Sequence, residues 1–211
     1  MTVISVKDLV LRPIEIEDAQ RFAELVNDYS LAKFTSRVPY PYTLDDAEAF
    51  VRLATDEEQK GDEHRFAACR NSEIIACVGL RRSSKQGVYE LGYWVGADYR
   101  GAGVATNIAR AVVYFGFEIL NAQKIAAGHF VDNPASGRVL RKIGFRPTGE
   151  TLLTCSLARA AHIATPRFEM EQKMQRLTDN IAIAPSQDYA MSSPQPGNRY
   201  DNDCRISGAE N

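Results

Sequence analysis

Residues 88–105 read VYELGYWVGADYRGAGVA, and this stretch decides the fold. Its first part, residues 88–95, is rich in aromatic and branched side chains and predicts a β-strand. A glycine-rich loop follows, and from Val104 onward apolar side chains recur at the spacing of one helix face. A strand, a glycine turn and a helix N-terminus in this order form an anion site, because free backbone N–H groups converge there and the helix dipole favours negative charge.

The two central glycines of this loop suit a phosphate ligand. Gly101 and Gly103 have no side chains, so a phosphate can approach the main chain closely. The same loop also fits a plain strand-to-helix turn without a ligand, and both interpretations stay open at this point. Two nucleotide motifs do not fit: Thr106 stands where a dinucleotide fingerprint needs its third glycine, and the Gly-Lys-Ser/Thr of a Walker loop is absent.

The segments around the loop predict a mixed α/β fold. Three consecutive strands joined by short turns, the first turn at Asn71 and Ser72, favour an antiparallel meander over a doubly wound sheet. Strand-like runs lie at residues 8–12, 65–70, 74–81 and 88–95. Helices are predicted at residues 17–27, after the N-cap Thr43, from Val104 onward, and between the N-cap Asn133 and the terminator Gly144.

Composition and charge are those of an ordinary globular protein. The 211 residues include 25 Lys and Arg against 27 Asp and Glu, a net charge of −2, which argues against a general nucleic-acid binder. The longest apolar run, residues 74–80, is too short to span a membrane, and no signal-peptide pattern is present. Four cysteines without Cys-x-x-Cys spacing indicate reduced thiols. We therefore expect a cytoplasmic protein with no nucleic-acid or membrane partner, either a monomer or a homodimer.

The chain divides into one domain and an appendage. The domain is expected over residues 1–177, because residues 178–211 turn polar and lose apolar periodicity. A segment of that composition cannot bury enough surface to offset its chain entropy, so we predict a disordered C-terminal tail. The tail is either a tolerated extension or an acidic interaction segment.

The glycine loop resembles the signature of a known enzyme family. Residues 100–105, Arg-Gly-Ala-Gly-Val-Ala, are similar to the Arg/Gln-x-x-Gly-x-Gly/Ala motif of the GNAT superfamily, the acetyl-CoA-dependent N-acetyltransferases. A second block, N-x-x-S-x-x-x-L-x-K-x-G-F, is matched from Asn133 to Phe145 and is typical of the RimJ/RimL-like branch. Further blocks at residues 11–13, at 41–43 with 46–47, and at 90–94 extend the resemblance over roughly residues 8–174.

The resemblance implies a GNAT fold, with a central, mostly antiparallel twisted sheet that is splayed at its fourth and fifth strands and flanked by helices on both faces. Residues 88–95 and 124–131 are the splayed strands, and the pantetheine arm of the co-substrate acetyl-CoA lies between them. The Val95 N–H then polarises the thioester carbonyl, an interaction often worth ~3 kcal/mol. The implied pyrophosphate contacts come from Arg100, Gly101, Ala102, Gly103, Val104 and Ala105, and Asn133 either contacts the cofactor or only caps its helix.

Two side chains are candidates for proton transfer. Glu90, on the strand that presents Val95, could take the proton of the attacking amine, directly or through water. It could equally be a strand acid that is solvated or paired with Arg81 or Arg82. The leaving thiolate also needs a proton, and the tyrosine that many family members use for this is replaced here by Leu140. Ser136 is the alternative donor in this branch.

Aromatic residues are the candidates for the acceptor site. Tyr40, Tyr42, Phe34 and Trp94 could line an acceptor pocket, although aromatic side chains are more often part of a core. No metal site is predicted, because the three histidines are isolated and lack ligand spacing.

The favoured function is therefore an N-acetyltransferase that moves an acetyl group from acetyl-CoA to a protein N-terminus or a small-molecule amine. An antibiotic or sugar-amine acetyltransferase is the alternative within the enzymes. A catalytically silent CoA-binding or regulatory module is the alternative outside them, because Leu140 stands at the tyrosine position. A nucleotide dehydrogenase is the least favoured.

Overall fold

The computed structural model describes residues 2–172 and 181–185, and within them nine strands form a single sheet. The order across the sheet is β7-β8-β6-β5-β4-β3-β2-β1-β9, and every neighbouring pair is antiparallel except β5 and β6. The strands are β1 (Thr2–Val6), β2 (Leu9–Pro13), β3 (Glu63–Arg70), β4 (Glu73–Arg82), β5 (Val88–Val95), β6 (Lys124–Gly128), β7 (Arg146–Ser156), β8 (Ala161–Glu171) and β9 (Ile181–Pro185).

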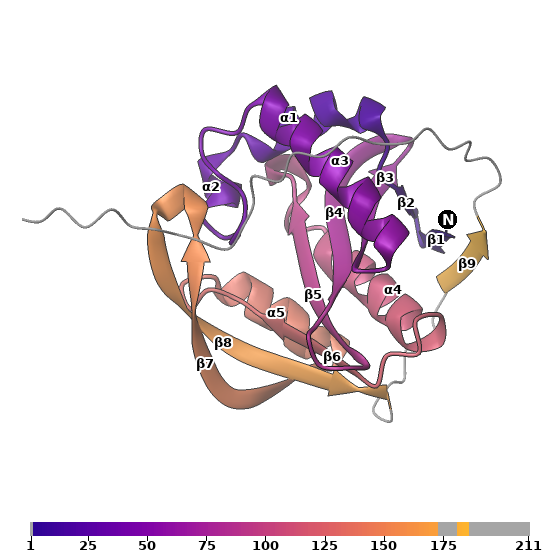
Figure 1. The fold of residues 1–211 in the computed structure, drawn as a ribbon, viewed down its shortest axis with the longest axis vertical. Coiled ribbons are helices and arrows are strands. Elements are labelled where there is room, and N and C mark those ends of the chain that lie inside the picture. The colour runs from indigo at the N-terminus through magenta and orange to yellow at the C-terminus, as the bar shows by residue number, and fades with distance from the viewer. Residues whose placement is uncertain (1, 173–180, 186–211) are drawn as a thin grey trace, which may run out of the picture.

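Helices cover both faces of this sheet, as predicted (Figure 1). One apolar core lies between the sheet and α1 with α3, and a second core lies between the opposite face and α4 with α5. The helices are α1 (Ala19–Val26), α2 (Tyr29–Ala32), α3 (Leu44–Lys60), α4 (Val104–Glu118) and α5 (Pro134–Ile143), with short 3-10 turns η1 (Ile16–Asp18), η2 (Ala97–Tyr99) and η3 (Leu157–Arg159).

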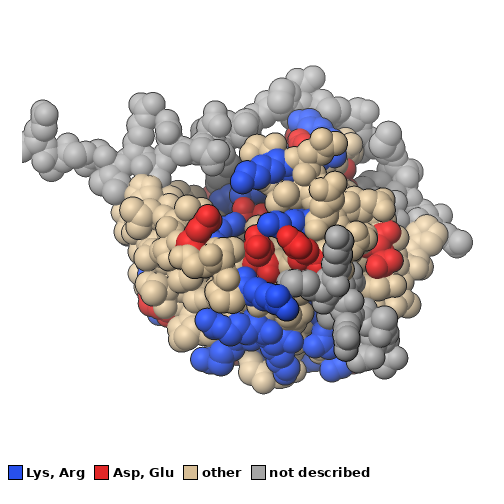
Figure 2. Space-filling model, turned by 90° about the horizontal axis from the view of Figure 1, so that it is seen from below, with Lys and Arg blue, Asp and Glu red and all other residues tan. Residues whose placement is uncertain are grey.

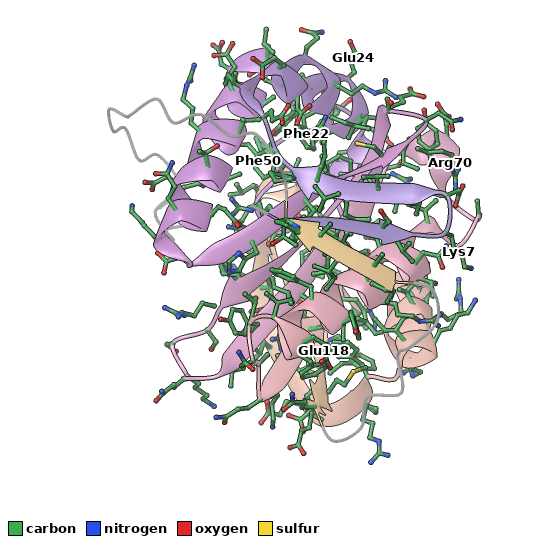
Figure 3. All side chains as sticks on the ribbon, turned by 90° about the vertical axis from the view of Figure 1, so that its right-hand side faces the viewer. Lys7, Phe22, Glu24, Phe50, Arg70 and Glu118 are labelled. Carbon is green, nitrogen blue, oxygen red and sulfur yellow. The ribbon has the colours of Figure 1, made fainter. Side chains whose placement is uncertain are left out.

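Local capping and packing signals fix α3 and α1. The Thr43 hydroxyl accepts from the Asp46 N–H at 3.2 Å, and the Asp46 carboxylate accepts from the Thr43 N–H at 2.9 Å, so the helix begins where the sequence predicts. Phe22 of α1 and Phe50 of α3 meet with ring centroids 5.4 Å apart (Figure 3). This contact holds the two helices together over the sheet.

The central meander is regular. Asn71 and Ser72 both have positive φ angles, 49° and 67°, which is the geometry of a two-residue hairpin turn. β4 and β5 pair without a register shift from Ala76–Val95 to Arg82–Tyr89. Side chains along β5 therefore alternate, so that Val95 packs under α4 and Trp94 packs under α1.

The sheet opens between β5 and β6. These strands pair over only three residues of each, Val88–Glu90 with Lys124–Ala126. Beyond Glu90 the edge of β5 no longer has a strand partner on this side. The splay expected between the fourth and fifth strands is therefore present. These strands are β5 and β6 in the structure, because β1 is an additional strand that the sequence did not predict.

The prediction that the C-terminal tail is disordered is wrong for residues 181–185. These residues form β9, which pairs antiparallel with β1 from Thr2–Pro185 to Val6–Ile181. Ile181 and Ile183 pack against the core, whereas the alanines that follow them turn outward. This Ile-Ala alternation is a short strand pattern, and the edge of β1 provides the backbone partners that the segment lacks alone. The remainder of 178–211 lies outside the described residues.

The surface carries charges of both signs. The face seen in Figure 2 shows acidic side chains next to a larger group of Lys and Arg along one margin. In the described part of the chain, no helix is long and apolar enough to cross a bilayer. Cys69 and Cys77 are buried free thiols, Cys155 is half-buried, and Cys204 lies outside the described residues.

Candidate active site

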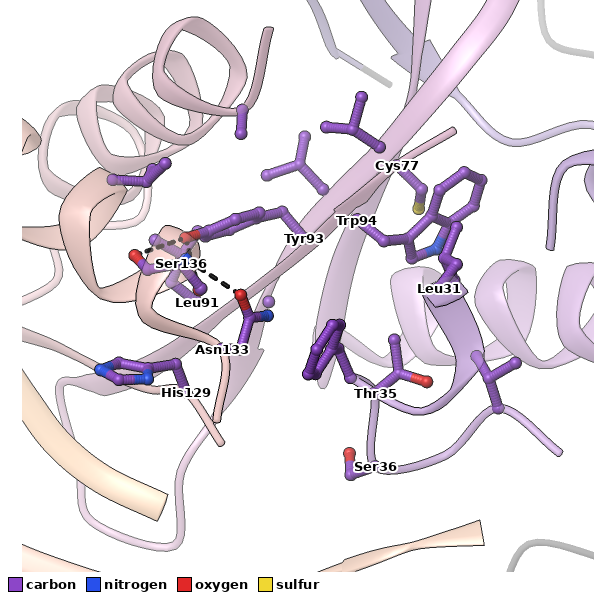
Figure 4. Close-up of a pocket in the computed structure, with 18 of the residues that line it drawn as sticks. Leu31, Thr35, Ser36, Cys77, Leu91, Tyr93, Trp94, His129, Asn133 and Ser136 are labelled. Carbon is purple, nitrogen blue, oxygen red and sulfur yellow. Dashed lines mark hydrogen bonds between the residues drawn. The ribbon is translucent and has the colours of Figure 1, made fainter. Parts of the chain in front are cut away.

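A cavity of about 870 Å³ opens where β5 and β6 part. Its wall on one side is formed by the glycine loop, the start of α5 and the loop before it. Its wall on the other side is formed by α2, the segment that follows α2, and β3 with β4. Figure 4 shows Trp94, Cys77 and Leu31 on the second side, and Tyr93, Asn133 and Ser136 on the first. The strand β5 thus runs through the middle of one continuous cavity.

The glycine loop has the geometry of an anion site. Gly101 and Gly103 adopt left-handed φ angles of 80° and 78°, and a Cβ at either position would meet nothing within 4 Å. Gly103 is the N-cap residue of α4, and no side chain caps this helix. The first N–H groups of α4 therefore lack a side-chain acceptor, in the arrangement that favours anions. Of the predicted loop residues all but Ala102 line the cavity, namely Arg100, Gly101, Gly103, Val104 and Ala105.

The Arg100 side chain serves the protein itself. Its Nε donates to the Val95 carbonyl at 3.1 Å, and its other nitrogens reach Ser30 at 2.9 Å and Asp28 at 3.3 Å. Partial burial opposes ionisation of Asp28, but hydrogen bonds from Ser30 and the charge of Arg100 hold the pKa of Asp28 below its usual value. Arg100 thereby ties α2 to the end of β5, and its own backbone N–H donates to the Ala97 carbonyl at 3.3 Å.

The backbone of Val95 faces the gap between the splayed strands. The Gly96 N–H donates to the Ile75 carbonyl on β4 at 2.9 Å, so Gly96 points its N–H toward β4. Successive residues of a strand direct their backbone groups to opposite edges. The Val95 N–H therefore points away from β4, on the side where Arg100 reaches the Val95 carbonyl.

A pair of hydroxyl groups lies on the same side of the cavity. The Tyr93 and Ser136 hydroxyl oxygens are 2.9 Å apart, and the tyrosine also lies 3.3 Å from the Ser136 carbonyl (Figure 4). Burial raises the pKa of Tyr93 to about 12. Asn133 caps α5 by accepting from the Ser136 N–H at 3.3 Å, so the predicted cap is confirmed. Leu140 is fully buried in the core and does not line the cavity.

Glu90 is ion-paired, but with neither arginine considered from the sequence. Its Oε1 lies 2.9 Å from Arg167 Nη1, and both residues line the cavity. Arg81, its neighbour on β4, makes no ion pair within the described residues. Glu90 precedes Val95 by five residues, about 17 Å along an extended strand. Its carboxylate therefore reaches the neighbourhood of Val95 only through intervening water or ligand.

The aromatic candidates separate into two groups. Trp94 lines the cavity and packs edge-on against Phe22, with ring centroids 5.7 Å apart. Tyr42 also lines it, with its N–H donating to Asn27 at 3.1 Å. Tyr40 is not part of the lining, contrary to expectation: its ring packs 5.2 Å from that of Tyr29 and is 48% exposed.

Several charged residues of the cavity were not found from the sequence. Glu63 accepts from Arg65 at 2.6 Å and from Arg37 at 3.2 Å, and all three line the wall opposite the glycine loop. Only Arg65 falls within a strand-like run of the sequence, 65–70, and nothing local links it to Arg37, which is 26 positions from Glu63. His129, which the sequence placed near the splayed strands, lines the other wall, where its Nδ1 lies 2.8 Å from the Phe130 carbonyl. Within the described ranges, no three His, Cys, Asp or Glu side chains gather as a metal site would require.

Comparison with known proteins agrees with this architecture. The sequence profile described as "Acetyltransferase (GNAT) domain" matches residues 8–146. The chain is 30% identical over 149 residues to the uncharacterized N-acetyltransferase YnaD of Bacillus subtilis. This alignment covers 69% of this chain and 84% of YnaD. It is 26% identical over 154 residues to the spermidine N(1)-acetyltransferase of Escherichia coli K12, covering 70% and 78% of the two chains.

A solved structure shares the fold. RimJ of Mycobacterium smegmatis, crystallised with CoA-disulfide, superposes with a TM-score of 0.71 at 19% identity, covering 82% of this chain and 88% of RimJ. The profile match spans well over half of the chain, and the fold is shared with that of RimJ. The chain therefore belongs to the GNAT acetyltransferase family.

Proposed function

We propose that this protein transfers an acetyl group from acetyl-CoA to a primary amine, by direct attack of the amine on the thioester. One observation carries the proposal: the uncapped N-terminus of α4, the outward-facing N–H of Val95 and a polar wall across β5 all open on one cavity. This arrangement holds a long anionic substrate on one side and leaves the other side for an acceptor.

Acetyl-CoA is proposed to bind from the side of α4 and α5. Its pyrophosphate lies on the main chain of Arg100, Gly101, Ala102, Gly103, Val104 and Ala105, because backbone N–H groups and the dipole of α4 act together there. Asn133 lines the same wall and contacts the pantetheine arm while it caps α5.

The Val95 N–H then hydrogen-bonds the thioester oxygen. A donor fixed in place before the reaction stabilises the negative charge that develops on this oxygen, by roughly 3 kcal/mol. The amine nitrogen forms its bond to the carbonyl carbon, and the carbon–sulfur bond breaks with its electron pair moving to sulfur. Glu90 accepts the amine proton through a chain of intervening waters, and the sulfur receives a proton from Ser136. Glu90 then releases its proton to solvent and Ser136 regains one from solvent, so that both side chains return to their starting states.

The acceptor is proposed to be a protein N-terminal amine or a small-molecule amine. An α-amino group has a pKa of about 8, against about 10.4 for a lysine side chain, so it loses its proton with less assistance. Trp94 and Tyr42 supply apolar surface on the acceptor side of the cavity. A cytoplasmic location, the absence of nucleic-acid and membrane partners, and a monomeric or homodimeric state stay predictions.

A silent CoA-binding module is the second candidate, because Leu140 occupies the position of the usual tyrosine. One assay separates the two functions: thiol release from acetyl-CoA is followed over a panel of peptides and small amines, with calorimetry for CoA in parallel. Turnover on at least one amine supports the enzyme. Saturable CoA binding without turnover on any amine supports the silent module, and no affinity for CoA contradicts both.

A further inference from the structure

On the acceptor side of the cavity, the sheet carries two neighbouring glycines, Gly92 and Gly79, which we call the glycine floor. Gly92 lies in the middle of β5 and lines the cavity, and a Cβ there would meet nothing within 4 Å. Its partner on β4 is Gly79, which pairs in turn with Arg65 on β3. A central strand rarely carries glycine, because glycine has no side chain to pack there. Glycine at such a position often marks a site where a ligand approaches the backbone closely.

Two arginines border this floor by lying over neighbouring glycines. A Cβ on Gly79 would stand 3.1 Å from Arg65 Cγ, and a Cβ on Gly128 of β6 would stand 2.8 Å from Arg167 Nη1. Gly128 follows Ala126 by two residues, as Gly92 follows the paired residue Glu90. Arg65 and Arg167 therefore lie on opposite sides of the open position at Gly92.

Ion pairs hold both guanidinium groups in place. Arg65 Nη2 lies 2.6 Å from both Glu57 and Glu63, whereas its Nη1 is buried and has no hydrogen-bond partner among the described residues. Arg167 uses one nitrogen for Glu90 at 2.9 Å, and no other bond of its guanidinium is found in the described part of the chain. Each arginine thus keeps unused N–H groups of a fixed planar fork, which suits a carboxylate.

Positive charge exceeds negative charge around this floor. On the acceptor side of the cavity, away from Arg100 and Arg138 on the other wall, the lining includes four arginines, Arg37, Arg65, Arg81 and Arg167, and two acids, Glu63 and Glu90. One positive charge remains even when Glu57, which pairs with Arg65 outside the lining, is counted. Arg81, which makes no ion pair within residues 2–172 and 181–185, is this surplus charge. A polycationic acceptor would be repelled here, whereas an acidic group would be attracted.

We propose that the acceptor amine carries a carboxylate, which binds over Gly92 between Arg65 and Arg167, with Arg81 as its further partner. The inference rests on the proposed N-acetyltransferase function and names its substrate class. The carboxylate belongs either to a free amino acid or to an acidic side chain close to a protein N-terminus, since both place the same group near the amine.

Matched acceptors and three variants test this inference. The acceptors are phenylalanine with its amide, C-terminally amidated Ser-Asp with amidated Ser-Asn, and spermidine. Arg81→Gln removes the surplus charge, and Gly92→Ala fills the floor without meeting a neighbour. Arg70→Gln is the control, because Arg70 pairs with Asp8 outside the cavity lining. Thermal melts and the KM for acetyl-CoA confirm that each variant is folded and binds its co-substrate.

We expect kcat/KM of the wild-type protein to be at least about tenfold higher for an acidic acceptor than for its neutral twin, since a charged hydrogen bond is lost in the twin. Arg81→Gln should lower that ratio by roughly fivefold or more, Gly92→Ala should raise the KM of acidic acceptors by about tenfold, and Arg70→Gln should change neither. The phenylalanine and dipeptide arms identify which source of carboxylate is used.

Three results would contradict the inference. A wild-type preference for neutral acceptors or for spermidine overturns the substrate class. An acid preference that survives both Arg81→Gln and Gly92→Ala overturns the site. Acetyl-CoA binding without turnover on any amine overturns the proposed function, and this inference with it, which distinguishes the two failures.

Discussion

The hydroxyl oxygen of Tyr93 lies 2.9 Å from that of Ser136, across the gap from β5 to the first turn of α5. When the tyrosine donates to Ser136 Oγ, the serine hydrogen is free to point into the cavity. Since Leu140 is buried away from the cavity, this pair is the hydroxyl source that we propose for the departing sulfur.

Ser136→Ala and Tyr93→Phe should both lower kcat, by roughly 10- to 100-fold for the serine, within the range of general acid catalysis, and by less for the tyrosine. The KM for acetyl-CoA should stay within about twofold, because neither hydroxyl lies in the glycine loop. Tyr89→Phe is the matched control, since Tyr89 lies on the same strand and face but outside the cavity lining. If Ser136→Ala turns over as fast as the wild type, the serine is not the proton donor.

The Tyr93 and Ser136 hydroxyl pair also leads to a prediction for how the reaction rate depends on pH. Burial raises the pKa of Tyr93 to about 12, so the tyrosine keeps its proton throughout the range in which amines become neutral. Rates measured from about pH 6 to pH 10 should therefore rise as the acceptor amine loses its proton, with no alkaline decline caused by Tyr93. An alkaline limb that is present in the wild type and disappears in Tyr93→Phe would show that the tyrosine ionises earlier.

Glu90→Gln should depress kcat at neutral pH and move the pH profile to higher values, because the amine then has to lose its proton to solvent without help. The expected loss is about tenfold or more near pH 7, and smaller where the amine is already neutral. Glu169→Gln is a suitable control, since Glu169 is also ion-paired in the sheet, with Lys124 at 2.7 Å, but lies outside the lining. An unchanged profile removes Glu90 as the base.

Gly103→Ala should weaken CoA binding by roughly tenfold or more, measured by calorimetry, because a Cβ would stand where the pyrophosphate approaches the main chain. Gly61→Ala controls for backbone strain: Gly61 ends α3 with a φ of 70°, close to the 78° of Gly103, and has equally open surroundings. Both variants should lose a similar ~1 kcal/mol of stability, since an alanine is strained in this region. If CoA affinity falls equally in both, the loop does not hold the diphosphate.

Asp28 should stabilise the folded protein only at pH values at which its carboxylate is ionised. Its pKa in the folded protein is below the unfolded value, so ionised Asp28 favours the folded state at neutral pH, and this contribution is lost as the pH falls through the folded pKa. Asp28→Asn should lower Tm slightly near pH 7, by the equivalent of under ~1 kcal/mol for a partly exposed pair. The difference should shrink as the pH falls through the folded pKa of Asp28. A difference that persists at low pH would contradict the ion pair with Arg100.

Local signals accounted for much of the fold. Thr43 with Asp46, Asn71 with Ser72, and Asn133 with Gly144 each fix a chain boundary through bonds within a few residues, so the sequence alone predicts them. The glycine loop is equally local. Its φ angles at Gly101 and Gly103 follow from residue type and from the strand and helix on either side.

The remaining contacts depend on residues distant in sequence. Tyr93 and Ser136 are 43 positions apart, and Glu90 and Arg167 are 77 apart, so their meeting is decided by how the strands assemble. Sequence spacing instead suggested Arg81 and Arg82 as partners of Glu90. Likewise the bare floor at Gly92 becomes visible only when the register sets it beside Gly79.

The pairing of β9 with β1 has a practical consequence for shortening the chain. A truncation after residue 177, at the boundary suggested by composition, would remove β9 and expose the backbone of residues 2–6 along one margin of the sheet. Such an unprotected margin templates edge-to-edge association and aggregation. Expression clones that end at or beyond Pro185 should therefore stay dispersed at concentrations where the shorter version precipitates.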